Sequence, residues 1–330
     1  MSKEHWRREN PQFYTYMDLP RSRVDGPPVA AGVDGALMSR DANSDAESWL
    51  LEIPPGWRRA ADDALGSTEF FVLRGDLALD GTKAGPSGYV HVPQGCGGGE
   101  LSSEAGALTF LYWNPHMPAF PPPYTVNRVV QSHKVPWRQS VPTSHSILHK
   151  ALRLPDPHGD GYEGGPGGHL RMEYVAPGMA TPFEHNHHEC FEELFILEGD
   201  CFIADEGVLG PGSAVGHPQE FWHGPFASRR GCLFLVHTDA PMGVPWGIRD
   251  YPNQQEICDA YLAEAPWDGP IEFALWENLP WKRFSQLPEF VEWMKTPAGQ
   301  DWGDKVGPLT ASKFRASWQR SVEKSLARRK

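Results

Sequence analysis

Hydrophobic residues along this chain occur in short runs that end at glycine or proline. The apolar run Phe70–Leu73 is followed by Arg74-Gly75-Asp76, and the run Leu194–Leu197 is followed by the similar Glu198-Gly199-Asp200. Another run lies at Cys232–Val236. The 34 glycines and 32 prolines among 330 residues are spread between such runs. This pattern favours many short strands joined by tight turns over long helices, so we predict an all-β protein.

The two halves of the chain resemble each other. Glu69–Asp76 corresponds to Glu193–Asp200, and the landmarks around both segments also recur. These landmarks are Pro55-Gly56 with Pro177-Gly178, Pro93-Gln94 with Pro218-Gln219, and Gly106–Leu108 with Gly231–Leu233. The offset stays between 122 and 125 residues, which small differences in loop length explain. The repeat predicts two copies of one β-domain in tandem.

A cluster of metal-ligand residue types marks the second copy. His185 and His187 are followed by Glu192 and, after six further residues, by Gly199; His223 comes later in the chain. Imidazole nitrogens and a carboxylate suit borderline divalent metals such as Fe(II), Mn(II), Ni(II), Cu(II) and Zn(II). Two histidines two positions apart point to the same face of a strand. The spacing therefore predicts a metal site built on strands from His185, His187, Glu192 and His223.

Neighbouring residues of the same types offer alternative ligands. His188 and Glu189 are adjacent to the cluster, but alternation places His188 on the opposite face from the histidine pair. Glu193 is likewise on the opposite face from Glu192. The six-residue gap to Gly199 selects Glu192.

These two segments resemble the two sequence motifs of the cupin superfamily. The resemblance implies small antiparallel barrels of the jelly-roll, or double-stranded β-helix, type that hold one metal with three histidines and one glutamate. The four residues above match those ligands position by position. The chain departs from the motif at Glu220, where glycine is usual, and at Ala227, where asparagine is common. Neither change removes a ligand.

The first copy lacks the corresponding ligands. Thr68 stands at the place of Glu192, and Gly98 stands at the place of His223. The stretch Arg59–Asp63 contains no histidine where the pair would fall. We therefore expect a degenerate first barrel with a structural role and a metal only in the second barrel.

The pattern divides the chain into five parts. We expect an N-terminal arm at 1–45, a degenerate barrel at 46–115, a Pro/Gly-rich linker at 116–167, a metal-binding barrel at 168–240 and a C-terminal extension at 241–330. The arm should contribute a strand at Val29–Met38. A short helix is expected at Leu287–Met294. A second helix is expected near the C-terminus, because Phe314, Trp318, Val322 and Leu326 recur at steps of four.

Charge and hydropathy limit the partners and the location. A net charge of -12 argues against nucleic acid as a partner. No apolar run approaches the length of a membrane span, and the charged N-terminus lacks the core of a signal peptide. We therefore expect a cytoplasmic protein with no membrane partner. The apolar face of the C-terminal helix suggests a homodimer.

The second barrel is further similar to the cupin-like domain of ChrR-type anti-sigma factors and to acetylacetone-cleaving dioxygenases. A three-His, one-Glu site keeps open coordination positions, which is typical of catalysis. The resemblance implies either a zinc-holding sensor domain or a non-haem dioxygenase. Our leading hypothesis is the dioxygenase, which would use Fe(II) and dioxygen to cleave a carbon–carbon bond of a small enolic, diketone or phenolic substrate.

Two alternatives to this function remain open. One is a redox-neutral hydrolase, lyase or isomerase that uses Zn, Mn or Ni as a Lewis acid, and the other is a non-catalytic metal-binding sensor; copper is a further candidate metal. Residues that could line the pocket or support the ligands are Arg171, Tyr174, Glu220, Phe221, Trp222 and His237.

Overall fold

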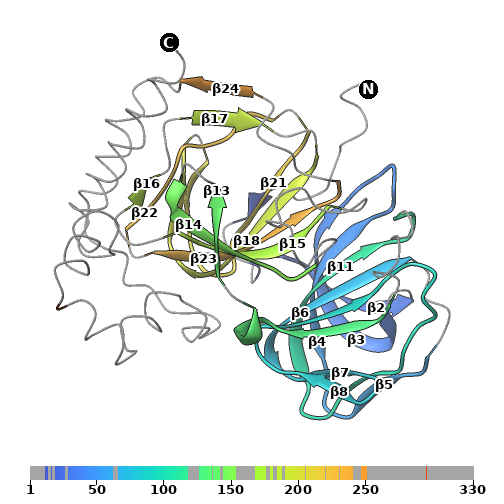
Figure 1. Cartoon of the computed structure of the whole chain (residues 1–330). Coiled ribbons are helices and arrows are strands. Elements are labelled where there is room, and N and C mark those ends of the chain that lie inside the picture. Colours follow the sequence, from blue (N-terminus) through green and yellow to red (C-terminus); the bar gives the residue numbers. More distant parts are fainter. Residues whose placement is uncertain are drawn as a thin grey trace.

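The computed structural model describes most of residues 12–250, and its strands form two barrels that lie side by side (Figure 1). The described residues are 12–13, 16, 19–26, 29–61, 66–117, 126–135, 137–141, 144–153, 168–175, 179–180, 184–187, 190–204, 206–219, 221–229, 231–240, 247–250 and 295. Within them, regular structure is almost entirely antiparallel β, apart from a 3-10 turn at Ser132–Lys134. The expected helices at Leu287–Met294 and near residues 314–326 lie outside the described residues.

The first barrel packs a seven-stranded sheet against a four-stranded sheet. The larger sheet has the order β12 (Arg128–Gln131), β9 (Gly88–Val92), β6 (Ser67–Gly75), β11 (Ala107–Asn114), β4 (Glu47–Ile53), β3 (Val29–Arg40) and β2 (Arg21–Gly26). The smaller sheet has the order β5 (Trp57–Arg59), β10 (Leu101–Ser103), β7 (Leu77–Leu79) and β8 (Thr82–Ala84). The strand expected at Val29–Met38 is therefore present and extends to Arg40.

The second barrel has the same plan with one addition. Its larger sheet has the order β1 (Gln12–Phe13), β21 (Ala214–His217), β18 (Glu192–Gly199), β23 (Cys232–Thr238), β15 (Leu170–Val175), β14 (Ser144–Ala151) and β13 (Arg138–Val141). Its smaller sheet has the order β16 (Met179–Ala180), β22 (Phe226–Ser228), β19 (Cys201–Ile203) and β20 (Gly207–Leu209). The addition is a pair formed by β17 (Glu184–His187) and β24 (Gly247–Asp250). The strand order confirms the tandem, all-β architecture expected from the sequence repeat.

The strand that precedes each copy in sequence pairs with the other copy. β1 precedes the first barrel but pairs with β21 of the second barrel. β12 precedes the second barrel but pairs with β9 of the first barrel. The segments expected to form an irregular arm and a linker therefore supply edge strands as well as connections. Strands β2 and β3 widen the first large sheet, and β13 and β14 widen the second.

Strand alternation gives each large sheet one face toward its own barrel and one face toward the other barrel. In β6, Phe70 and Val72 belong to the core of the first barrel, while Phe71 and Leu73 belong to a second cluster that includes Phe195 of the other barrel. The rings of Phe110 and Phe195 lie 6.0 Å apart across this boundary. Apolar side chains of the two barrels therefore pack against each other across this boundary.

β6 and β18 each end at a glycine, and the contacts of these glycines explain why the two copies are most similar in sequence there. Gly199 has a φ of +82°, and a Cβ atom at this position would lie 1.7 Å from the carbonyl oxygen of Gly231. Gly75 has a φ of +81°, and its Cβ would lie 1.9 Å from the carbonyl oxygen of Gly106. Only glycine fits a left-handed residue with such a close backbone neighbour.

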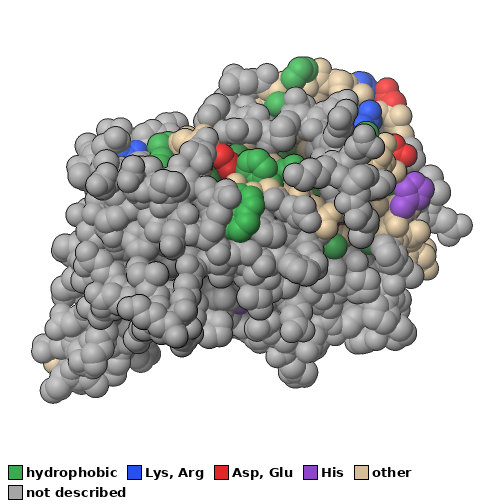
Figure 2. Space-filling model, turned by 90° about the horizontal axis from the view of Figure 1, so that it is seen from above, with side chains coloured by type: hydrophobic (Ala, Val, Ile, Leu, Met, Phe, Trp, Pro, Cys, Tyr) green, Lys and Arg blue, Asp and Glu red, His purple; other side chains and the backbone are tan. Residues whose placement is uncertain are grey.

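On the face drawn in Figure 2, the described side chains are of mixed character, with hydrophobic, acidic and basic groups interspersed. Among the described residues, no helix has the length and hydropathy needed to span a bilayer.

Candidate metal centre

Glu192 enters the second barrel because of strand alternation in β18. Glu192 is buried, with 5% of its surface exposed. The adjacent Glu193 points to the other face, where its carboxylate accepts a hydrogen bond of 2.8 Å from Ser39 Oγ and another from Ser48 Oγ, both in the first barrel. The structure therefore confirms that the two glutamates lie on opposite faces, with Glu192 inside.

His217 lies directly opposite Glu192 in the sheet. It is the last residue of β21, and the register pairs it with Glu192 of β18. Side chains of directly paired residues share one face of an antiparallel sheet. The Nδ1 atom of His217 lies 3.2 Å from Oε2 of Glu192, and the histidine is 2% exposed.

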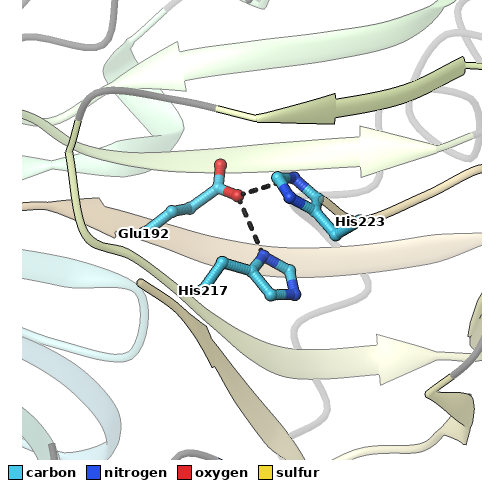
Figure 3. A group of neighbouring side chains, drawn as sticks. All are labelled: Glu192, His217 and His223. Carbon is cyan, nitrogen blue, oxygen red and sulfur yellow. Dashed lines mark hydrogen bonds and ion pairs between the residues drawn. The ribbon is translucent and has the colours of Figure 1, made fainter. Parts of the chain in front are cut away.

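His223 approaches the same carboxylate oxygen from the loop between β21 and β22. Its Nε2 atom lies 3.3 Å from Oε2 of Glu192, and its ring stacks on that of His217 with centroids 4.0 Å apart (Figure 3). The candidate ligand atoms of Glu192, His217 and His223 all lie within 4.8 Å of one another. Among the described residues, this is the one group of such side chains able to hold a metal ion.

In each histidine, the ring nitrogen farther from Glu192, called here the outer nitrogen, already has an acceptor. Nδ1 of His223 lies 3.1 Å from the carbonyl oxygen of Phe221, and Nε2 of His217 lies 2.9 Å from Oε1 of Glu206. Histidine ligands of metals usually donate their second N–H to a carbonyl or carboxylate, which fixes the tautomer and the ring orientation. The arrangement leaves Nε2 of His223 and Nδ1 of His217 to face Glu192. These donors fit a divalent transition metal, and two histidines with one carboxylate are the set found in non-haem iron oxygenases.

In the metal-free protein, burial and nearby charges shift the pKa values of the two histidines in opposite directions. Burial lowers the pKa of His217, but its hydrogen bonds to Glu192 and Glu206 outweigh this effect and raise the pKa to about 9. Burial and the charge on His217 lower the pKa of His223. One imidazolium and one neutral imidazole therefore stack beside Glu192 near neutral pH.

Metal uptake should therefore release a proton. A metal needs the lone pair of His217 Nδ1, so a proton must leave below pH 9, and the apparent affinity should rise up to about tenfold per pH unit until that pH. Calorimetric titration with Zn(II) or Mn(II) at pH 7.5, in buffers of different ionisation enthalpy, should give close to one proton per metal. A heat of binding that does not depend on the buffer would contradict this expectation.

The expected ligands His185 and His187 lie in β17, which pairs with β24. His185 is opposite Arg249, and His187 is opposite Gly247, so the backbone places both histidines on one face of a strand. Their side chains lie outside the described part of the structure. Their contact with the metal stays a prediction.

The six expected pocket residues fall into different places. Arg171 points into the barrel, and its Nε atom lies 2.6 Å from Oε1 of Glu173. Tyr174 and His237 point instead toward the barrel boundary, where Tyr174 packs edge-on against Trp137, and His237 lies 3.2 Å from a guanidinium nitrogen of Arg153. The structure does not bring these two residues to the metal ligands, because alternation along β15 and β23 turns them away.

Phe221 and Trp222 lie in the loop that leads to His223. Phe221 stacks on His217 with ring centroids 5.7 Å apart, although 44% of its surface is exposed. Trp222 is half-buried in the same loop. Glu220 lies outside the described residues. This loop thus supplies a carbonyl and an aromatic ring to the two histidines.

Sequence reasoning did not find His217. The spacing of the second motif points to Pro218 and His223 and passes over His217, the residue immediately before Pro218. The missing signal is the pairing of β21 with β18, because that register alone puts His217 opposite Glu192.

Comparisons with solved structures identify the fold. A protein from Nostoc punctiforme PCC 73102, provisionally described as a dioxygenase, matches with a TM-score of 0.58 and 17% identity over 75% of this chain and 87% of that chain. A protein from Pseudomonas aeruginosa, provisionally described as glyoxylate-induced, matches with a TM-score of 0.52 and 15% identity over 68% and 87% of the two chains. Oxalate decarboxylase from Bacillus subtilis gives 0.49 and 11% over 79% and 86%. No family model and no curated protein matches the sequence.

At these identities the likeness establishes the fold alone. The chain has the bicupin fold, with two cupin barrels in tandem. Its second barrel contains the buried group of two histidines and one glutamate that can hold a metal ion.

Proposed function

We propose that this protein is a non-haem, metal-dependent dioxygenase that binds Fe(II) through Glu192, His217 and His223 and cleaves a carbon–carbon bond of a small enolic, diketone or phenolic substrate. The observation that carries the proposal is the convergence of two histidine nitrogens on one carboxylate oxygen, with both outer nitrogens already held by acceptors. A structural metal is closed by protein ligands, whereas these three ligands leave positions open, and in an octahedral site one position would stay open even with His185 and His187 bound as the sequence predicts.

The protein's own groups prepare this site in three ways. Glu206 and the carbonyl of Phe221 hold the histidine rings in place. Phe226 packs edge-on against His223, with ring centroids 5.9 Å apart, and reduces the access of water. Burial strengthens the electrostatic interactions of Glu192 in the barrel. An iron ion at such a site would supply the activation of dioxygen and of an acidic substrate oxygen.

Oxygen consumption tests the proposal. Protein prepared anaerobically and loaded with Fe(II) should consume oxygen with at least one member of a panel of β-diketones, catechols and enolic acids. His217→Ala and His223→Ala should each lose this activity. Glu193→Gln, which changes a carboxylate on the opposite face of the same strand, should retain it.

Two results would contradict the proposal. One is iron-loaded protein that consumes no more oxygen than metal-free protein across the panel. The other is substrate turnover with Zn(II) or Mn(II) under strict anaerobiosis, which would establish a redox-neutral hydrolase, lyase or isomerase instead.

A further inference from the structure

His169 shares one face of the large sheet with the metal ligand Glu192. The backbone N–H of Thr238 donates to the carbonyl of His169 at 2.9 Å, and the N–H of His169 donates to Thr238 Oγ1 at 2.9 Å. Thr238 is in turn paired with Glu192. Glu192 of β18, Thr238 of β23 and His169, the residue before β15, thus form one row. Alternation along the strands places their side chains on the face inside the second barrel. The backbones of Glu192 and His169 are two strand spacings apart, about 10 Å.

Within the described part of the structure, the side chain of His169 is buried without a hydrogen-bond partner. Its relative exposure is 0%, and neither ring nitrogen has a hydrogen-bond partner in the described structure. Burial, with Arg171 and Arg153 nearby, lowers its pKa well below the ordinary value, so the ring is neutral. A neutral imidazole has one donor and one acceptor, and leaving such groups unpaired is costly enough that buried ones are nearly always satisfied.

The first barrel shows what these interior positions contain when no site is present. The register places Glu47 of β4 opposite Trp113, as His169 lies opposite Thr238. Glu47 is satisfied by Trp49 Nε1 at 2.7 Å and by an ion pair with Arg40. The next two interior positions of β4 are Trp49 and Leu51, which belong to the apolar core.

The corresponding positions of the second barrel are charged. Arg171 and Glu173 occupy the places of Trp49 and Leu51 and pair with each other inside the barrel. Buried polar side chains cost more than apolar ones at the same positions. Their occurrence in the barrel that holds the metal ligands, and not in its repeat, indicates that they serve a ligand.

We propose that His169 is a substrate-binding residue that hydrogen-bonds to an acidic group of a small molecule chelated at the metal centre. This inference rests on the proposed metal site and adds the substrate class: an enolic or phenolic compound that also has a carboxylate. The N–H of His169 donates to the carboxylate, and the neighbouring Arg171 favours its negative charge. The backbones of Glu192 and His169 are only about 10 Å apart, so the molecule between them must be compact.

Two catechols test the assignment without turnover. Catechol and 3,4-dihydroxybenzoate have the same chelating hydroxyls, but only the second has a carboxylate. Protein loaded with Fe(III) should give a visible charge-transfer band with each, so that both affinities can be measured. Wild-type protein should bind 3,4-dihydroxybenzoate at least about tenfold more tightly, the gain expected from one hydrogen bond to a charged group.

Substitutions separate the role of His169 from general packing. His169→Phe should remove the preference for 3,4-dihydroxybenzoate and leave catechol binding within about twofold, while His169→Gln, which keeps a donor, should retain most of the preference. His91→Phe is the matched control, because His91 is also buried but belongs to the first barrel, where it bonds to Ser67 at 3.0 Å. It should leave both affinities unchanged.

The following outcomes would contradict the proposed role of His169. A wild-type protein that holds iron but binds neither catechol, or binds both equally, would show that His169 serves no carboxylate. The same conclusion follows if His169→Phe keeps the preference. Loss of iron from wild-type protein on desalting would instead show that the metal site itself is wrong, and the substrate contact would fail with it.

Discussion

Replacing Glu192 by glutamine is expected to weaken metal binding more than about 100-fold. Residues that only orient metal ligands already contribute 10–100-fold in affinity, and Glu192 is the carboxylate on which both histidines converge. Glutamine keeps the size of the side chain but removes the negative charge. Competition for Zn(II) with a chromogenic chelator measures the effect directly.

Glu193→Gln provides the matched control for this substitution. Glu193 is as buried as Glu192, with 4% exposure against 5%, but it bonds to Ser39 and Ser48 across the barrel boundary. We expect metal affinity to stay within about threefold of wild type and the free energy of unfolding to fall by about 1–3 kcal/mol. Comparable losses of metal affinity in the two variants would show that the assignment of the faces is wrong.

Arg153→Met is expected to destabilise the protein by about 3–5 kcal/mol, since a buried ion pair would lose one partner. Arg153 follows β14 and is 3% exposed, and its Nε atom lies 2.9 Å from Oε2 of Glu69 in the first barrel. The hydroxyl of Tyr89 also donates to this oxygen at 2.6 Å. The substitution would leave Glu69 charged and buried without its cation.

A double substitution distinguishes the ion pair from simple packing. In Glu69→Gln/Arg153→Met the buried charge is absent, so most of the lost stability should return. Urea denaturation of wild type, both single variants and the double variant gives the coupling energy. An Arg153→Met variant within about 1 kcal/mol of wild type would contradict the importance of this pair.

The same ion pair suggests what the degenerate barrel does. Arg153 lies 3.2 Å from Nε2 of His237, whose neighbour Thr238 is paired with Glu192. Glu69 therefore supports, through Arg153, the strand next to Glu192, the proposed ligand. The first barrel has Thr68 paired with Val92 where the second has Glu192 paired with His217. It thus keeps the scaffold and the boundary contacts without the ligands.

The sequence predicts the features that depend on local period and on repeats. Alternation in β18 assigns Glu192 to the barrel interior and Glu193 to the boundary, and the structure confirms both. The repeat around Gly75 and Gly199 predicts the tandem barrels, because a close backbone contact forces glycine in both copies. Alternation along one strand and the recurrence of a segment can both be read directly from the sequence.

Features that depend on pairing between strands are not visible in the sequence. His217 becomes a candidate ligand only through the register of β21 with β18, and His169 enters the same row only through β23. The exchange of β1 and β12 between the copies is likewise a matter of tertiary pairing. Tyr174 and His237 were plausible pocket residues for their chemistry, but alternation directs them to the barrel boundary.

A metal-loaded crystal structure, with anomalous diffraction measured at the absorption edge of the bound metal, would show directly which residues bind the ion. We expect one metal ion in the second barrel, bonded at about 2.0–2.2 Å to an oxygen of Glu192, to Nδ1 of His217 and to Nε2 of His223. A metal ion elsewhere, or one that leaves His217 unbonded and still attached to Glu192 by a hydrogen bond, would contradict it.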